Sequence, residues 1–147
     1  MTWLLPPVLV VFCLIAMVAM DQLSPFRDVI THPWRLSGIA IGAFGLLADL
    51  SSAVRFLRLK TNIVPFRDPD SVVVSGLFAY TRNPMYLGYL LILLGAAVYL
   101  GSLLPFLMVL VFFVAADRWY IPDEERRLEK LFGDEYAAYR RRVRRWL

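Results

Sequence analysis

Residues 84–120 read PMYLGYLLILLGAAVYLGSLLPFLMVLVFFVAADRWY, and this stretch decides the fold. It contains two apolar runs, Met85–Leu100 and Leu103–Tyr120, with only Gly101 and Ser102 between them. A helix rises about 1.5 Å per residue, so the first run makes a helix of about 24 Å, slightly shorter than the hydrocarbon core of a bilayer. Two helices joined by so short a turn must be antiparallel neighbours. The stretch therefore predicts a helical hairpin that crosses a membrane twice.

The composition of the whole chain also favours a membrane. Of its 147 residues, 59% are hydrophobic and 19% are charged, and the mean hydropathy is +0.60. A typical soluble domain has about 25% charged residues. A chain this small cannot bury so much apolar surface in one aqueous core. We expect one integral membrane domain over residues 1–147.

Two further spans are expected before the hairpin, at Leu4–Met20 and at about Leu36–Val54. Pro6 and Pro7 are tolerated because they fall in the first turn of the first helix. A signal peptide is the rival interpretation of this run. It is disfavoured because no basic residue precedes the run and no clear small-x-small cleavage site follows it.

The second expected span carries three glycines and one acid. Gly38, Gly42 and Gly45 fall near one face, which favours close helix packing over phosphate binding. Asp49 lies at membrane depth, where a carboxylate is costly, so it should face protein or a wet cavity. Two interpretations of Asp49 stay open. It is either solvated at the interface or paired with Arg55 or another basic group, or it is a wall of a polar site.

The distribution of basic residues predicts the topology. The loop 21–35 holds Arg27 and Arg35, and the Gly101–Ser102 turn on the same side is uncharged. All the other lysines and arginines fall on the opposite side. The positive-inside rule makes that side cytosolic, so both termini should be cytosolic. We predict an all-α, polytopic protein of the cell membrane with about four transmembrane helices and short cytosolic C-terminal helices.

The connection Lys60–Asn83 is long and rich in aromatic residues, which is typical of a functional lid. Val72–Val74 is a short extended candidate within it. After Pro122 the pattern is helical, with a break expected at Gly133. The last helix should be basic and amphipathic, suited to an anionic membrane surface, with one apolar side made by Tyr136, Tyr139, Val143 and Trp146. Nucleic acid is not expected as a partner because no nucleic-acid motif accompanies the charge.

Metal chemistry is not predicted. Cys13 is the single cysteine and lies in an apolar run, and His32 has no cysteine or histidine partner at metal-ligand spacing.

Two polar clusters flank the hairpin, at Tyr80–Gly88 and Asp117–Glu125. The turnaround should bring both to the same cytosolic rim. Arg82 and a helix start at Pro84 favour a carboxylate, while Glu124 and its neighbour Glu125 supply negative charge. This combination suits a zwitterion that also carries a sulfonium. Taken singly, these groups are also typical of an anchoring arginine and of solvated acids at a helix start.

The segment Ser75–Gly88 resembles the conserved segment of isoprenylcysteine carboxyl methyltransferases and related phospholipid methyltransferases. So do Glu124–Leu128 and Phe132–Tyr139, and the resemblance covers residues 62–146. It implies an integral membrane enzyme that uses S-adenosylmethionine at the cytosolic face. Its acceptor would be small or lipid-like, with a carboxylate, thiol or amine that receives the methyl group.

The resemblance also implies which residues form the site. Arg118 matches an arginine near the reacting centre, and Glu125 or Glu124 is a candidate to assist deprotonation of a thiol or amine acceptor. Asn83 stands where eukaryotic members have a histidine, so a titratable proton is not available there. The residues implied for cofactor binding are Arg82, Asn83, Pro84, Tyr86, Gly88, Glu124, Glu125, Tyr136 and Tyr139.

Two other functions are compatible with the hairpin. One is a non-catalytic membrane scaffold or small transport subunit. The other is a membrane reductase of the sterol type, which would retain a nicotinamide cofactor. The paired polar clusters favour the methyltransferase, and an apolar acceptor tail would enter sideways from the lipid.

Overall fold

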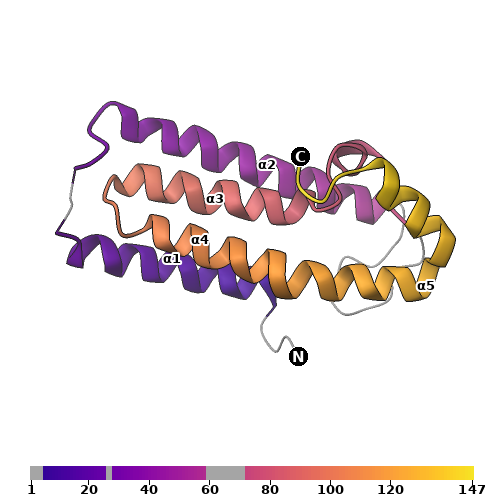
Figure 1. The fold of residues 1–147 in the computed structure, drawn as a ribbon. Helices are drawn as coiled ribbons and strands as arrows, with labels where there is room; N and C mark the ends of the chain where they lie inside the picture. The colour runs from indigo at the N-terminus through magenta and orange to yellow at the C-terminus, as the bar shows by residue number, and fades with distance from the viewer. Residues whose placement is uncertain (1–4, 26–27, 59–71) are drawn as a thin grey trace.

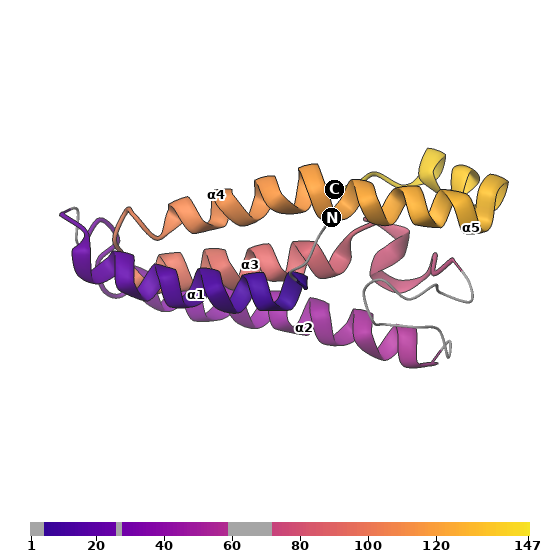
Figure 2. The same ribbon diagram turned by 90° about the horizontal axis from the view of Figure 1, so that it is seen from below.

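The computed structural model describes residues 5–25, 28–58 and 72–147, and the described chain is all-α. Four helices lie along one another, and the last of them continues through a π-helical turn, η3 (Ala116–Tyr120), into a fifth that extends past the bundle (Figures 1 and 2). This confirms the predicted all-α, four-helix arrangement. The helices are α1 (Pro6–Leu23), α2 (Ser37–Arg58), α3 (Pro84–Leu100), α4 (Phe106–Ala115) and α5 (Ile121–Arg142), with short 3-10 turns η1 (Trp34–Leu36) and η2 (Gly76–Ala79).

Glycines hold α2 and α3 at close range. A Cβ added to Gly38 would lie 2.4 Å from the carbonyl oxygen of Gly95, and one added to Gly45 would lie 2.6 Å from that of Gly88. Neither space admits a side chain, so the two backbones approach each other as only small residues permit. The prediction of close helix packing is confirmed for Gly38 and Gly45, whereas a Cβ on Gly42 would meet nothing within 4 Å.

The turn between α3 and α4 is longer than the two residues predicted. Gly101 ends α3 with a positive φ of 77°, and α4 begins only at Phe106. The loop after α1 meets this turn. The Ile30 N–H donates to the Gly101 carbonyl at 3.0 Å, and the Ser102 hydroxyl donates to Asp21 at 2.5 Å. The two loops that the charge pattern assigned to one side therefore lie together at one end of the bundle.

The outer faces of α1 and α2 are apolar and exposed. Phe12 is 62% exposed and Phe44 is 67% exposed, whereas Cys13, Met17 and Leu93 are fully buried between the helices. Two helical stretches, Pro6–Leu23 and Trp34–Arg55, are long and apolar enough to cross a membrane, and α3 is apolar but shorter. Because large exposed apolar faces are unfavourable in water, a bilayer accounts for them directly.

The C-terminal region follows the prediction only in part. Gly133 has φ 47° and ψ −117°, which confirms a break there, although the chain is helical on both sides of it. The prediction that Val143 and Trp146 continue the helix is wrong. The helix ends at Arg142 and Val143 is extended, because the following backbone pairs with the segment before α3.

Within the connection before α3, the described part is short. Residues 72–74 form no strand, so the extended candidate is not a β-strand here. Half of the predicted lid, residues 60–71, lies outside the described residues, and the lid interpretation stays a prediction.

Candidate functional site

The C-terminal segment lies against the entrance of α3, beside the residues that follow η2 (Figure 1). The Arg82 N–H donates to the Arg144 carbonyl at 2.9 Å. The Thr81 hydroxyl and the Asn83 side-chain amide both donate to the Arg145 carbonyl, at 3.1 and 2.9 Å. Residues more than sixty positions apart in sequence thus form one polar layer at this end of the bundle.

Glu125 is the centre of this layer. Its Oε1 accepts from Arg82 Nη2 and its Oε2 from Arg145 Nη2, both at 2.7 Å. The side chains of Glu125 and Arg82 are each only 9% exposed. Burying a carboxylate is costly unless it is paired, and here both of its oxygens are paired. The hydrogen bond from Arg145 to Glu125 raises the pKa of Arg145 above its ordinary value.

The structure therefore brings together Arg82 and Glu125, which the sequence assigned to one rim. It does not separate them into a cationic and an anionic corner, as the sequence analysis expected. They are a direct ion pair, and Arg82 Nη1 also donates to the carbonyls of Arg140 and Val143, at 3.1 and 3.2 Å. The cluster formed by Arg82, Glu125 and Arg145 is called the arginine–glutamate clamp below.

Donors remain at the entrance of α3. Arg82 Nε is buried and has no hydrogen-bond partner among the described residues. Asn83 is the N-cap of α3 but makes no capping hydrogen bond, and Pro84 is in the first turn. The first N–H groups of a helix lack partners within the helix, and its positive dipole end favours anions. These groups suit a carboxylate.

Glu124 lies beside aromatic rings rather than in the clamp. It is exposed, and its Oε2 accepts from the Tyr86 hydroxyl at 3.3 Å. The Tyr86 ring stacks on Tyr120 with centroids 6.4 Å apart and 28° between the planes. The Tyr86 and Tyr89 rings are nearly perpendicular, with centroids also 6.4 Å apart. Glu124 is therefore the accessible carboxylate of the pair, set next to an aromatic wall.

Tyr136 and Tyr139 fix α5 to the rest of the site. Both are buried, and burial raises the pKa of each to about 12. The Tyr139 hydroxyl donates to the Phe78 carbonyl at 2.7 Å. This bond joins the second half of α5 to η2, so both tyrosines stabilise the arrangement around the α3 entrance.

Two predicted site residues lie outside this cluster. The Arg118 side chain is 76% exposed, and its nearest acid is the adjacent Asp117 at 3.8 Å. Gly88 faces α2, where a Cβ would overlap the carboxylate of Asp49. Gly88 thus gives space to Asp49, and the donors of the α3 entrance lie one turn before it.

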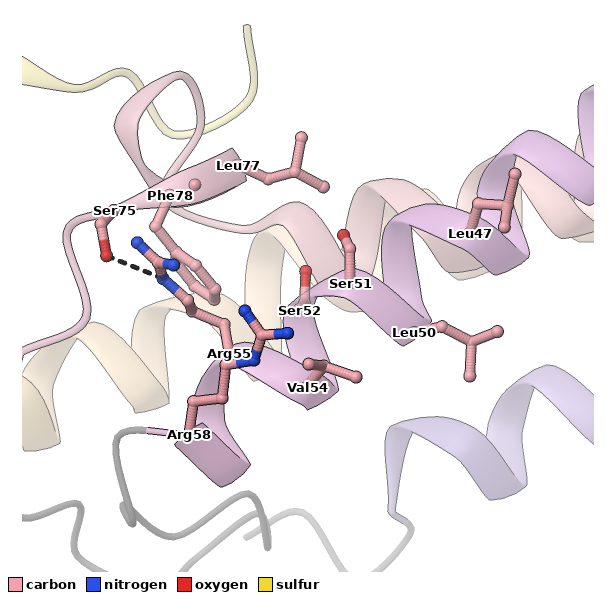
Figure 3. Close-up of a pocket in the computed structure, with 11 residues that line it drawn as sticks. Leu47, Leu50, Ser51, Ser52, Val54, Arg55, Arg58, Ser75, Leu77 and Phe78 are labelled. Atoms are coloured by element: carbon pink, nitrogen blue, oxygen red, sulfur yellow. Dashed lines mark hydrogen bonds between the residues drawn. The ribbon is translucent and has the colours of Figure 1, made fainter.

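Asp49 is not paired with Arg55, so that interpretation is wrong. Both Asp49 oxygens are buried without a hydrogen-bond partner among the described residues, while Arg55 Nε donates to the Ser75 hydroxyl at 2.9 Å (Figure 3). The alternative, that Asp49 is part of a polar wall, stays a prediction.

Two residues of the site were not identified from the sequence. The sequence predicts Trp146 on the apolar side of the last helix and gives Arg145 no role in the site. In the structure Arg145 Nη1 and Trp146 Nε1 both donate to Asp117 Oδ1, at 3.3 and 3.1 Å. The available signal was indirect: buried acids require cationic partners, and the C-terminal arginines are the richest source of them.

No group of three or more histidine, cysteine or acidic side chains could hold a metal ion within the described ranges.

Comparisons with known proteins agree with the resemblance noted in the sequence. A family model for phospholipid methyltransferases matches residues 34–135. An uncharacterized protein of Haemophilus influenzae is 48% identical over 63 residues, which cover 43% of this chain and all of that protein. The protein-S-isoprenylcysteine O-methyltransferase of Schizosaccharomyces pombe is 35% identical over 81 residues, which are 52% of this chain and 33% of that enzyme. No solved structure matches. Because the matching region spans most of its length, including α2, α3, α4 and most of α5, the chain belongs to the phospholipid methyltransferase family.

Proposed function

We propose that this protein transfers a methyl group from S-adenosylmethionine to a lipophilic acceptor at the cytosolic face of a membrane. Membership of a family of membrane methyltransferases supports the reaction class. The observation that carries the assignment is the entrance of α3. There, a buried arginine keeps one donor without a partner in the described part of the chain, beside a helix start that no side chain caps.

These donors would hold the carboxylate of the cofactor. Arg82 lies two residues before the start of α3, so its Nε and the first N–H groups of the helix belong to the same short stretch, and both favour an anion. The clamp keeps Arg82 in position, because Glu125 and two backbone carbonyls fix the other guanidinium nitrogens. The stacked rings of Tyr86 and Tyr120 would offer an aromatic face to the sulfonium. The residues present thus fit the cofactor.

S-adenosylmethionine supplies a methyl group that its sulfonium already activates. The protein's own work is to align the acceptor and exclude water. Orientation of this kind contributes about 7–11 kcal/mol in favourable cases. Tyr136, Tyr139 and the C-terminal segment would cover the site from the aqueous side, and Asn83 holds that segment through the Arg145 carbonyl.

Glu124 is the better candidate for accepting a proton from a thiol or amine acceptor. It is exposed and accepts only one described hydrogen bond, from Tyr86, whereas both oxygens of Glu125 are occupied by guanidinium groups. A carboxylate acceptor would need no base. We therefore assign Glu125 a positioning role and Glu124 the general-base role. Arg118, exposed near the end of α4, would bind lipid headgroups close to the incoming acceptor.

The proposed orientation places both termini in the cytosol, with the α1–α2 loop and the α3–α4 turn on the opposite side. The clamp, α5 and most of the described arginines lie at the other end of the bundle, which this orientation assigns to the cytosol. The basic end would contact the anionic leaflet.

Calorimetry of the full chain in lipid nanodiscs tests cofactor binding directly. We expect saturable binding of S-adenosylmethionine, weakened by Arg82→Gln and unchanged by Arg141→Gln, which removes an exposed charge from the same end of the protein. Labelled methyl transfer should then appear in lipid-extractable products. Absence of binding would favour a scaffold or transport subunit. Retention of a nicotinamide cofactor would favour a reductase, and transfer only to water-soluble acceptors would contradict lateral entry.

A further inference from the structure

A groove of about 600 Å³ lies between the second half of α2 and η2 (Figure 3). None of the residues assigned to cofactor binding lines it. One end is basic, formed by Arg55 and Arg58, and the other is apolar, formed by Leu47 and Leu50 (Figure 3). The groove is therefore amphipathic along its length.

The basic end is built for an anion. Both arginine side chains line the groove (Figure 3). Arg55 is held by its Nε, which donates to the Ser75 hydroxyl at 2.9 Å, and no hydrogen bond within the described residues occupies its two terminal nitrogens. Within the described residues, the ion pairs of the protein involve neither arginine. Two guanidinium groups that no acid among the described residues neutralises favour a phosphate, which they can bind through parallel N–H groups.

The apolar end of the groove lies on the part of α2 that would be surrounded by lipid in a membrane. Leu47, Leu50 and Val54 are 64%, 53% and 43% exposed on α2, one of the two helical stretches long and apolar enough to span a membrane. The hydroxyls of Ser51 and Ser52 already donate to the Ala48 carbonyl, so they add little polar recognition. The groove wall in this direction is aliphatic.

The dimensions match one leaflet. From Leu47 to Arg58 the helix advances about 16 Å at 1.5 Å per residue. Half of a bilayer core of about 30 Å is nearly the same length. A phosphate at the arginines thus places an acyl chain alongside Leu50 and Leu47, with its end near the bilayer midplane.

We propose that this groove binds a membrane phospholipid through its phosphate, and that the protein holds this lipid rather than methylating it. The assignment does not depend on the proposed methyl transfer. The groove is connected to the proposed cofactor site through η2. Phe78 lines the groove, and its carbonyl accepts the hydrogen bond from the Tyr139 hydroxyl. A bound lipid would therefore stabilise the wall on which α5 is fixed.

Native mass spectrometry of the delipidated full chain, with phosphatidylglycerol added back, tests the proposal. We expect one retained lipid, whose binding weakens roughly tenfold in the variant with both Arg55→Gln and Arg58→Gln. Arg141→Gln loses an exposed arginine outside the groove and should bind as the unmodified protein does. Equal retention by all three proteins would overturn the proposal. So would full displacement of the lipid by inorganic phosphate, which would indicate a site for the free anion.

A measurement on the unmodified chain keeps the test valid if the double variant does not fold. Phosphatidylglycerol should slow the modification of Arg55 and Arg58 by phenylglyoxal and leave that of Arg141 unchanged. Lack of protection would contradict the proposal. If Arg55→Gln abolished methyl transfer to lipid while cofactor binding stayed intact, the groove would be the acceptor site and the holding role would be wrong.

Discussion

Arg145 and Glu125 lie 20 positions apart on two different segments, and Arg145 Nη2 is 2.7 Å from Glu125 Oε2. Through this contact the last residues of the chain become part of the site. Glu125 bonds Arg82 with its other oxygen, so the same carboxylate links the C-terminal segment to the entrance of α3. Removing any one of these three side chains should therefore weaken the positioning of the other two.

Replacing Glu125 with glutamine should destabilise the protein by about 3 kcal/mol, because it leaves two guanidinium groups facing each other in a largely buried place. Chemical unfolding in detergent measures this. Glu129→Gln is the matched control on the same helix. Its pair with Arg140 is half-exposed at 3.4 Å, so its loss should cost no more than about 0.5 kcal/mol. Equal effects of the two changes would show that the clamp adds no stability.

Arg145→Ala should loosen the C-terminal segment without unfolding the bundle. The change removes the bonds to Glu125 and Asp117, while the backbone bridge at Arg144 remains. We expect faster carboxypeptidase cleavage and a roughly tenfold weaker affinity for S-adenosylmethionine, since Arg82 loses part of its support. Arg144→Ala, which removes an exposed side chain, should change neither. A wild-type affinity in the Arg145 variant would separate the clamp from cofactor binding.

Glu124→Gln should lower turnover by about 10²–10⁴-fold for an acceptor that must lose a proton, and leave a carboxylate acceptor unaffected. Stability should hold because the side chain is exposed. Rates of labelled methyl transfer at saturating cofactor give the comparison. Asp123→Asn, one position earlier and paired with Arg126, is the control. Equal rates in the glutamine variant and the unmodified enzyme would exclude Glu124 as the base.

Gly45→Ala and Gly42→Ala should differ sharply although they lie on the same helix. A Cβ at Gly45 would be 2.6 Å from the Gly88 carbonyl oxygen, whereas a Cβ at Gly42 has nothing within 4 Å. We expect the first change to cost about 1–3 kcal/mol by forcing α2 and α3 apart. The second should be neutral or stabilising by up to about 1 kcal/mol, because alanine favours helix. Thermal unfolding in nanodiscs distinguishes them, and similar midpoints would contradict this packing.

Tyr139→Phe should reduce the alkaline sensitivity of the fold. Burial raises the pKa of Tyr139 from 10.0 to about 12, so the folded protein holds a proton that the unfolded chain releases. The resulting stability is fully present below pH 10 and is lost as the pH rises through 12. The variant should lose about 1 kcal/mol at neutral pH with the bond to Phe78, and decline less between those pH values. Unfolding curves against pH test this, and an unchanged slope would refute it.

Local patterns predicted the helices well. The apolar runs around Gly101 and the glycines of α2 specify a hairpin and a close α2–α3 contact by their spacing alone. The hairpin and the α2–α3 contact were predictable because helix length, turn length and residue size are local properties of the sequence.

The site was predictable only in outline. The hairpin brings Arg82 and Glu125 to one end, which their positions in sequence imply. The contact of Arg145 with Glu125 depends on Arg145 leaving the last helix, and nothing local in the run from Arg140 to Arg145 marks that departure. A backbone pairing with Thr81, across most of the site, decides it. A local sequence pattern does not show which distant backbone groups will form hydrogen bonds with each other.

The π-helical turn Ala116–Tyr120 sets the direction in which α5 presents its side chains. A π turn accommodates one residue more than an α-helical path of similar rise, and each residue rotates the helix by about 100°. Removing one residue there would leave the hairpin intact and rotate Glu125 away from Arg82. The extra residue in this π turn thus decides which face of the 22-residue helix α5 is directed toward the entrance of α3.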